Sequence, residues 1–285
     1  MTADLHLHTT ASDGALSPLE AARLAALRGM ELIAVTDHDA VEGADALTQT
    51  NGLPLRVLSG VELSISDMRG LHLLGYGRLE ADAPLRKQLT SLRRARVTRM
   101  AQMIDKLRAL GVSVDTEALS GLHGAVGRPH LARLLVQQGF AADMKDAFTR
   151  YLAEGRPAYV ASARLNMAQA LELMAQSGMV SVLAHPARLE IEAQQLPTLL
   201  EKWQGMGLMG DEVYHPAQAS RGFAALDRLA RSRGLLVTGG SDFHAPGTDG
   251  HGMIGETAGK WPRMNEDVQA LLLQVEARQK SADRG

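Results

Sequence analysis

The chain has 285 residues, of which 45% are hydrophobic, so it can bury a large core and is not a disordered protein. Its formal net charge of −2 excludes general polyanion binding, and any affinity for phosphate must come from a local cluster of cations. The absence of cysteine excludes disulfides, thiolate metal ligands and a cysteine nucleophile.

The first 80 residues alternate between expected strands and helices. Apolar runs predict strands at 3–8, 32–37, 56–65 and 71–76. A helix is expected over 18–27, because Ser17 can cap its start and Gly29 can end it. This alternation is typical of an α/β protein.

The pattern then becomes helical before the strands resume. Between 81 and 165, apolar residues such as Leu85, Leu89 and Leu92 recur at helical spacing. Further strands are expected at 179–184, 210–214 and 235–240, with helices at 168–177 and 219–233 between them. We therefore predict an α/β barrel made of 1–80 and 166–285, with an inserted helical module at 81–165 that caps the substrate.

Histidines and acidic residues recur at the ends of these apolar runs. His6 and His8 lie two residues apart in a strand, so both imidazoles face the same side. The carboxyl ends of parallel strands meet at one mouth, so residues far apart in sequence can gather there. The residues that follow this pattern are Asp13, His38, Glu62, His72, His185, Asp242 and His244. Together they predict a metal site. Mixed imidazole and carboxylate ligands suit manganese, zinc or iron, and we favour manganese.

The same motifs resemble those of the polymerase and histidinol phosphatase (PHP) family. The resemblance rests on motifs in both halves of the chain: His6-x-His8, Asp13-Gly14, Thr36-Asp37-His38-Asp39, Gly60-Val61-Glu62, His72, His185-Pro186 and Gly240-Ser241-Asp242-x-His244. It implies a distorted seven-stranded β/α barrel of the amidohydrolase-like enzymes, two or three divalent metals, and hydrolysis of phosphate esters. The insert, with Gly127-Arg128-Pro129-His130, resembles the branch of 3′,5′-nucleoside bisphosphate phosphatases and short-RNA 5′ exonucleases.

The resemblance also implies an assignment of ligands and catalytic residues. It gives His6, His8, Glu62 and Asp242 to a first metal, and Glu62, His72 and His185 to a second. A third metal would take Asp13, His38 and His244, although many relatives carry a histidine where this chain has Asp13. Glu62, Asp242 and His185 are the expected catalytic residues.

Other residues are expected to orient the ligands or to bind substrate. Asp37 is expected to orient a ligand histidine, because a ligating imidazole usually donates its other N–H to a carboxylate or carbonyl. Arg128 suits bidentate phosphate binding, and Pro129 at a helix start would expose backbone N–H groups beside it. The remaining candidates for substrate binding are His130, Arg156, Tyr159 and His215. The alternative for Arg128 is a surface position, and for His130 a packed one.

Two further groups are expected to have structural roles. The arginines between Arg86 and Arg99 are expected to form a solvated helix face, although one or two could face the mouth. His123 and His251 are expected to be structural or at the surface.

The sequence leaves four functions open. The first is a metal-dependent phosphatase that releases the 3′-phosphate of a 3′,5′-nucleoside bisphosphate, using a metal-activated water. The second is a 5′-to-3′ exonuclease on short RNA, and the third is a histidinol phosphate phosphatase, which would leave Arg128 unused. A non-enzymatic, metal-stabilised module associated with a polymerase is the fourth. No signal segment and no apolar stretch near the roughly 20 residues that span a bilayer is seen, so we expect a cytoplasmic protein without membrane or obligate protein partners.

Overall fold

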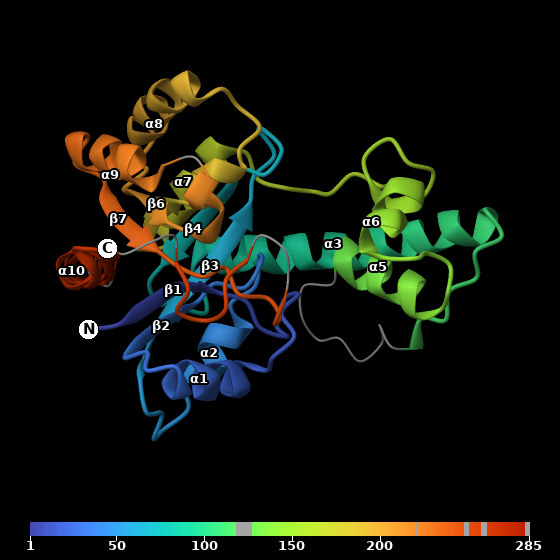
Figure 1. Ribbon diagram of the computed structural model, residues 1–285, viewed down its shortest axis with the longest axis horizontal. Helices are drawn as coiled ribbons and strands as arrows, with labels where there is room; N and C mark the ends of the chain where they lie inside the picture. The colour runs from blue at the N-terminus through green and yellow to red at the C-terminus, as the bar shows by residue number, and fades with distance from the viewer. Residues whose placement is uncertain (118–126, 221, 248–250, 258–260, 283–285) are drawn as a thin grey trace.

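Seven strands form one sheet that curls into a nearly closed barrel in the computed structural model (Figure 1). The structure describes residues 1–117, 127–220, 222–247, 251–257 and 261–282. The strands are neighbours in chain order: β1 (Ala3–Leu7), β2 (Leu32–Val35), β3 (Arg56–Ser64), β4 (His72–Tyr76), β5 (Val180–Leu183), β6 (Gly210–Tyr214) and β7 (Leu236–Gly239). The predicted seven-stranded β/α barrel is confirmed.

The barrel closes beside the first strand. A parallel bridge joins Leu7 to Phe243, and the amide of Asp242 donates to the carbonyl of His6 over 2.9 Å. At this seam Gly240 lies so close to His6 that a Cβ would collide with it. The closure therefore brings the end of β7 directly against the two histidines of β1.

One strand runs against the direction expected for it. β1–β3 are parallel and β5–β7 are parallel, but β4 is antiparallel to both of its neighbours. His72 at the start of β4 pairs with Ser64 at the end of β3. His72 thus reaches the mouth from the amino end of its strand, and not from a carboxyl end.

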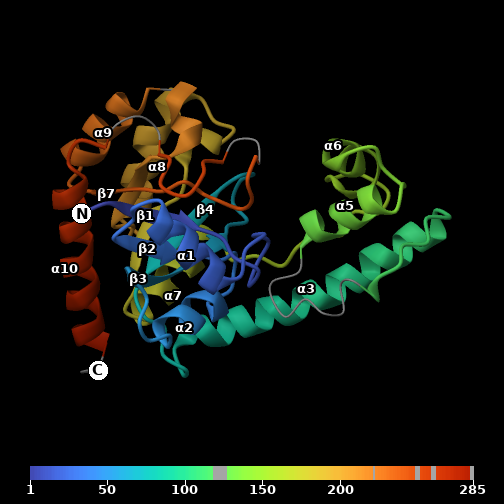
Figure 2. The ribbon, with the colours of Figure 1, turned by 60° about the horizontal axis from the view of Figure 1, so that its bottom comes forward.

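Helices cover the outside of the barrel (Figures 1 and 2). Ser17 caps the first helix, as the sequence predicts, and the structure adds a reciprocal capping box with Glu20. The helices around the barrel are α1 (Pro18–Leu27), α2 (Glu42–Thr48), α7 (Met167–Gln176), α8 (Leu196–Gln204), α9 (Phe223–Ser232) and α10 (Met264–Ala282), with short helical turns at Pro186–Arg188, Ala193–Gln195 and Pro216–Ser220. Within the described part of the chain, no helix has the length and apolar character needed to cross a membrane.

A long helix, α3 (Pro84–Ala109), extends away from the barrel and carries α5 (Arg128–Gln137), α6 (Met144–Ala147) and a π-helical turn at Phe148–Leu152 (Figure 2). Its first half packs into the barrel core through Leu85, Leu89 and Leu92. Its second half contributes Met103 and Leu107 to a separate core with α5. The division of the chain into 1–80, 81–165 and 166–285 stays a prediction.

Candidate metal centre

Four side chains from three parts of the chain converge inside the mouth of the barrel. His6 and His8 are fully buried on one face of β1. The Nε2 atoms of His6 and His8 lie 3.3 and 3.1 Å from Oε2 of Glu62, and again 3.3 and 3.1 Å from Oδ1 of Asp242. Both Nε2 atoms and the Glu62 oxygen are buried and lack a hydrogen-bond partner among the described residues. Such unpaired nitrogen and oxygen donors fit a divalent cation.

Glu62 is the centre of this arrangement. Its Oε1 lies 2.8 Å from Nδ1 of His72 and 2.9 Å from Nε2 of His185, and its Oε2 lies 3.0 Å from Nδ1 of His38. Burial alone would raise the pKa of Glu62, but the charges of His38, His72 and His6 hold that pKa well below its usual value. Glu62 therefore presents an ionised carboxylate to two sides of the site.

A third group lies on the side of the loop that follows β1. Oδ1 of Asp13 is 3.4 Å from Nε2 of His244 and 3.9 Å from Nδ1 of His8. The potential donor atoms of His8, Asp13, His38 and His244 all lie within 4.8 Å of one another. The structure thus brings together all nine residues proposed as ligands, and His8 also faces the third group.

Asp37 acts one step away from the histidines. It accepts hydrogen bonds from Ser12 Oγ at 2.6 Å and from the Thr9 amide at 2.7 Å. Ser12 Oγ in turn lies 3.5 Å from Nδ1 of His8. Among the described residues, Asp37 therefore fixes the loop that carries Asp13 and reaches His8 through Ser12, whereas the sequence suggested direct orientation of a histidine.

Glu212 orients two of the histidines and was missed in the sequence. Its Oε1 lies 2.9 Å from Nδ1 of His6, and its Oε2 accepts from the His185 amide at 2.8 Å. The sequence did contain a signal for Glu212: it is an acidic residue inside the expected strand at 210–214. A carboxylate that is fully buried in a strand needs hydrogen-bond or ionic partners, so such a residue is a candidate for the site.

Three side chains surround the other oxygen of Asp242, and Nδ1 of His251 also lies 2.6 Å from the main-chain carbonyl of Asp242. Its Oδ2 lies 3.2 Å from Nε2 of His215, 3.2 Å from Nη1 of Arg188 and 3.1 Å from Nδ1 of His251. His215 is fully buried, and its Nδ1 accepts from the Ala217 amide, so its Nε2 carries the hydrogen that Asp242 accepts. The geometry gives His215 and His251 places behind Asp242, and it points Oδ1 towards His6 and His8.

The backbone is strained at the same place. Among the described residues, three that are not glycine have positive φ: Asp39 at 49°, His185 at 28° and Asp242 at 52°. Each stands in or beside the cluster. Strain of this kind persists where the surrounding structure imposes it, typically at functional sites.

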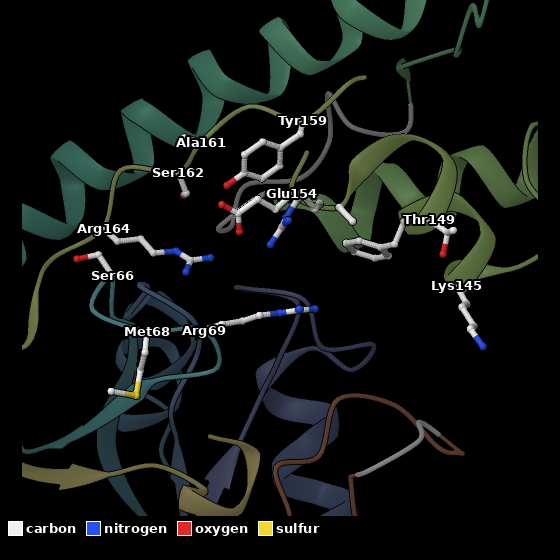
Figure 3. Close-up of a pocket in the computed structure, with 13 residues that line it drawn as sticks. Ser66, Met68, Arg69, Lys145, Thr149, Glu154, Tyr159, Ala161, Ser162 and Arg164 are labelled. Atoms are coloured by element: carbon white, nitrogen blue, oxygen red, sulfur yellow. The ribbon is translucent and has the colours of Figure 1, made fainter. Parts of the chain in front are cut away.

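Two cavities that share lining residues lead away from the cluster. The first, of about 220 Å³, is lined by residues that include Asp13, His38, His72 and Arg96. The second, of about 570 Å³, lies between the loop after β3 and the helices of the insert (Figure 3). Both are lined by Arg128, Ser162 and Arg164.

The larger cavity is rich in cations and has two aromatic rings. Figure 3 shows the side chains of Arg69 and Arg164 extending into the same space, near Glu154 and Tyr159. The Arg128 guanidinium lies 5.7 Å from the ring centres of both Phe148 and Tyr159. Burial and the neighbouring Arg164 lower the pKa of Arg128. Such a cavity suits an anion attached to a planar group.

The residues proposed for substrate binding are only partly brought together. Arg128 and Tyr159 line the larger cavity, whereas Arg156 is exposed and lines neither of the two cavities. Nδ1 of His130 accepts from the Gly127 amide at 3.1 Å, which caps its own helix. The sequence did not single out Arg69 or Arg164, and His123 lies outside the described residues.

The arginines of α3 form the expected solvated face only in part: Arg94 is exposed, four others are paired, and one of these, Arg96, faces the mouth, as the alternative allowed. Arg86 pairs with Asp45, Arg93 with Glu42 and Arg96 with Asp39, while Nε of Arg99 donates to the Val160 carbonyl at 2.8 Å. The acidic partners belong to α2 and the segment before it. The pairing was not expected, because a helical charge pattern alone does not reveal that α3 passes α2.

Comparison with known proteins agrees with this geometry. The model of the PHP domain family matches residues 4–179. A 3′,5′-nucleoside bisphosphate phosphatase of Chromobacterium violaceum is 35% identical over 254 residues, covering 87% of this chain and 88% of that protein. A 5′-3′ exoribonuclease of Haemophilus influenzae is 32% identical over 246 residues, covering 85% and 90%. A phosphoribosyl 1,2-cyclic phosphate 1,2-diphosphodiesterase of Eggerthella lenta is 31% identical over 254 residues, covering 86% and 94%.

Solved structures extend the similarity to the whole fold. An amidohydrolase from Chromobacterium violaceum, with bound sulfate and no metal, superposes with a TM-score of 0.81 at 32% identity and covers 96% of this chain and 97% of its own. A putative metal-dependent phosphoesterase from Bifidobacterium adolescentis gives a TM-score of 0.79 at 26% identity, covering 95% and 96%. The chain therefore belongs to the PHP domain family of metal-dependent phosphoesterases.

Proposed function

We propose that this phosphoesterase removes the 3′-phosphate from 3′,5′-nucleoside bisphosphates, such as adenosine 3′,5′-bisphosphate, and leaves the 5′-monophosphate. The observation that carries the proposal is the pair of cavities that share Arg128 and Arg164. The smaller one adjoins the metal cluster and would hold the phosphate to be cleaved, and the larger one offers cations for a second phosphate. The bisphosphate phosphatase of Chromobacterium violaceum, at 35% identity, supports this substrate.

The donor set fits two or three divalent cations, and manganese is the proposed metal. His6, His8, Glu62 and Asp242 would hold the first, Glu62, His72 and His185 the second, and Asp13, His38 and His244 the third. Bound there, the cations would supply Lewis acidity and an activated water. The catalytic residues Glu62, Asp242 and His185 would fix their spacing.

The protein side chains would then select and orient the substrate. Arg128 and Arg164, at the junction of the cavities, would hold the nucleotide in place with charge-assisted hydrogen bonds. Tyr159 and Phe148 would contact the base or the ribose. This orientation is needed to remove the 3′-phosphate selectively, because the metals alone would bind either phosphate of the substrate in the same way.

A 5′-to-3′ exonuclease acting on short RNA is the second candidate. The exoribonuclease of Haemophilus influenzae, at 32% identity, favours it. The net charge of −2 argues against affinity for a long polymer, which grows with the number of neutralised phosphates. A histidinol phosphate phosphatase would leave the arginines of the larger cavity without a ligand, and a non-catalytic polymerase module would not need them.

The test is a direct comparison of substrates. Metal-free protein would be reloaded with manganese, zinc or iron and given adenosine 3′,5′-bisphosphate, the 5′-monophosphate, histidinol phosphate and a short 5′-phosphorylated RNA. We expect rapid release of one phosphate from the bisphosphate, no reaction of the 5′-monophosphate, and the highest rate with manganese. Faster release of nucleotides from the RNA would contradict the proposal and favour the exonuclease.

A further inference from the structure

Arg96 differs in its surroundings from the other arginines of α3, such as Arg93, which pairs with Glu42 of α2. The side chain of Arg96 is only 12% exposed, whereas that of Arg93, one helical turn earlier, is 38% exposed. Arg96 lines the smaller cavity together with Asp13, His38 and His72, three of the proposed metal ligands. Arg93 instead lines a separate cavity between α2 and α3. Arg93 thus holds α3 against α2, whereas Arg96, about one helical turn later, faces the metal cluster.

The backbone that carries the ligands fixes the guanidinium of Arg96. Asp39, its partner, directly follows His38 in the chain and has a φ of 49°. The Asp39 amide donates to the Glu62 carbonyl at 2.8 Å, and its Oδ1 accepts from the Ser64 amide at 3.2 Å. The position of Arg96 is therefore coupled to the strand end that presents Glu62.

Arg96 is also an incompletely paired buried cation. Among the described residues, Arg96 forms an ion pair with one carboxylate, that of Asp39, and its buried Nε has no hydrogen-bond partner. Burial lowers the pKa of Arg96 to about 10, with Asp13 acting in the opposite direction, so the group keeps its charge at neutral pH. Arg128 and Arg164 line the same cavity, so its lining suits an anionic ligand.

We propose that Arg96 is a catalytic residue that binds the phosphoryl group undergoing hydrolysis. The helix that carries the insert, α3, places Arg96 beside the metal cluster. This inference rests on the proposed phosphoesterase site, but it does not depend on the nucleotide. Water adds to phosphorus, the bond from phosphorus to the ester oxygen breaks, and the proton released by the water passes to the leaving oxygen through solvent. Arg96 neither gains nor loses a proton. Its fork donates to phosphoryl oxygens, which it would stabilise most strongly in the transition state.

The alternative is that Arg96 only docks α3 on the barrel. Arg93 provides the matched control, because it makes the same kind of ion pair from the same helix to Glu42 of α2 and does not line the cavity beside the metal cluster. If docking were the whole role, Arg93→Gln and Arg96→Gln would lower the melting temperature and the activity together. If Arg96 is catalytic, Arg96→Gln should lower the activity far more than Arg93→Gln does, without a matching fall in melting temperature.

The experiment compares manganese-loaded wild type, Arg96→Gln, Arg96→Lys, Arg96→Ala and Arg93→Gln. Hydrolysis of 4-nitrophenyl phosphate and of adenosine 3′,5′-bisphosphate would be measured together with metal content and melting temperature. For Arg96→Gln we expect kcat to fall by about 10²- to 10³-fold with the metals retained. We expect partial activity for Arg96→Lys, partial rescue of Arg96→Ala by millimolar guanidinium, and activity within about threefold of wild type for Arg93→Gln.

The outcomes separate this inference from the proposed nucleotide substrate. Wild-type activity on 4-nitrophenyl phosphate without activity on the bisphosphate would contradict the nucleotide proposal and leave the Arg96 comparison intact. Retained kcat in Arg96→Gln, or equal losses in Arg93→Gln and Arg96→Gln, would overturn the catalytic role. Binding of inorganic phosphate, measured by calorimetry on the metal-loaded proteins, gives a readout apart from turnover. We expect binding at least about tenfold weaker in Arg96→Gln, and equal binding in both proteins would also overturn the inference.

Discussion

Glu62 and Asp242 face each other across the imidazoles of His6 and His8, and each carboxylate lies 3.1 to 3.3 Å from both Nε2 atoms. Neither carboxylate is near the other in sequence. They meet because the end of β7 lies beside β1 at the closing seam of the barrel, while β3 lies on the other side of β1, one strand further on beyond β2.

Replacing Glu62 by Gln should remove metal and activity together. The amide keeps the shape but loses the negative charge and one of the two acceptor oxygens that face the histidines. We expect the loss of at least one metal equivalent by mass spectrometry and a fall in kcat of about 10³-fold. Glu172→Gln, on the exposed face of α7, is the control and should retain both. Full metal content and activity in Glu62→Gln would show that the site has been assigned to the wrong residues.

His215 should affect metal affinity through Asp242. The carboxylate of Asp242 accepts a hydrogen bond from Nε2 of His215. Asn is too short to donate this hydrogen bond, whereas the longer side chain of Gln can place an amide N–H near Asp242. We expect metal affinity to fall by about 10- to 100-fold in His215→Asn and by less in His215→Gln. Competition with a chelator measures this directly. Equal affinities in the two variants would argue against an orienting hydrogen bond.

Arg164 should govern the choice of substrate. Its side chain lines both cavities, so Arg164→Gln should raise KM for adenosine 3′,5′-bisphosphate by roughly 10-fold or more and change KM for 4-nitrophenyl phosphate much less. Arg133→Gln on α5, where the side chain is exposed, is the matched control. A uniform change for both substrates would place Arg164 at the cleaved phosphate and not at the remote one.

Asp211 should make stability depend on pH. It is fully buried on β6, and neither carboxylate oxygen has a hydrogen-bond partner among the described residues. Burial and the charge of Glu212 raise the pKa of Asp211 well above its usual value. The folded protein therefore holds this proton more tightly than the unfolded chain. The resulting stability is fully present below the ordinary carboxyl pKa and is lost as pH rises through the raised one.

Asp211→Asn removes this titration while keeping the shape. The variant should gain free energy of unfolding relative to wild type as pH rises from about 4 to 8, by about 1.4 kcal/mol for each tenfold change in the ionisation constant. Urea unfolding of the metal-free proteins at several pH values measures the difference. A difference that does not change with pH would mean that Asp211 titrates normally.

The sequence predicted the positions of the strands better than it predicted whether neighbouring strands run parallel or antiparallel. All seven strands were expected at nearly the observed positions, because buried apolar runs bounded by turn residues have few alternative structures. The direction of β4 was missed, although the short connection between Ser64 and His72 could have revealed it. A parallel connection needs a dozen or more residues to cross over, so a link this short favours antiparallel pairing.

Within the site, histidine spacing located the cluster, while the groups around it depended on tertiary structure. Glu212 and His251 carry no local motif, and they act only because β6 and the loop after β7 bring them behind His6 and Asp242. In the sequence, Arg96 resembles the other arginines of α3 in every local respect. What distinguishes it is the path of α3 past Asp39, which no periodicity encodes.

Anomalous X-ray diffraction from crystals of the active, manganese-loaded protein, with data collected at the manganese absorption edge, tests the assignment of the metal ligands directly. We expect anomalous peaks between His6, His8, Glu62 and Asp242, and between Glu62, His72 and His185. Active crystals with no manganese peak at these residues, or with peaks only elsewhere, would contradict this assignment.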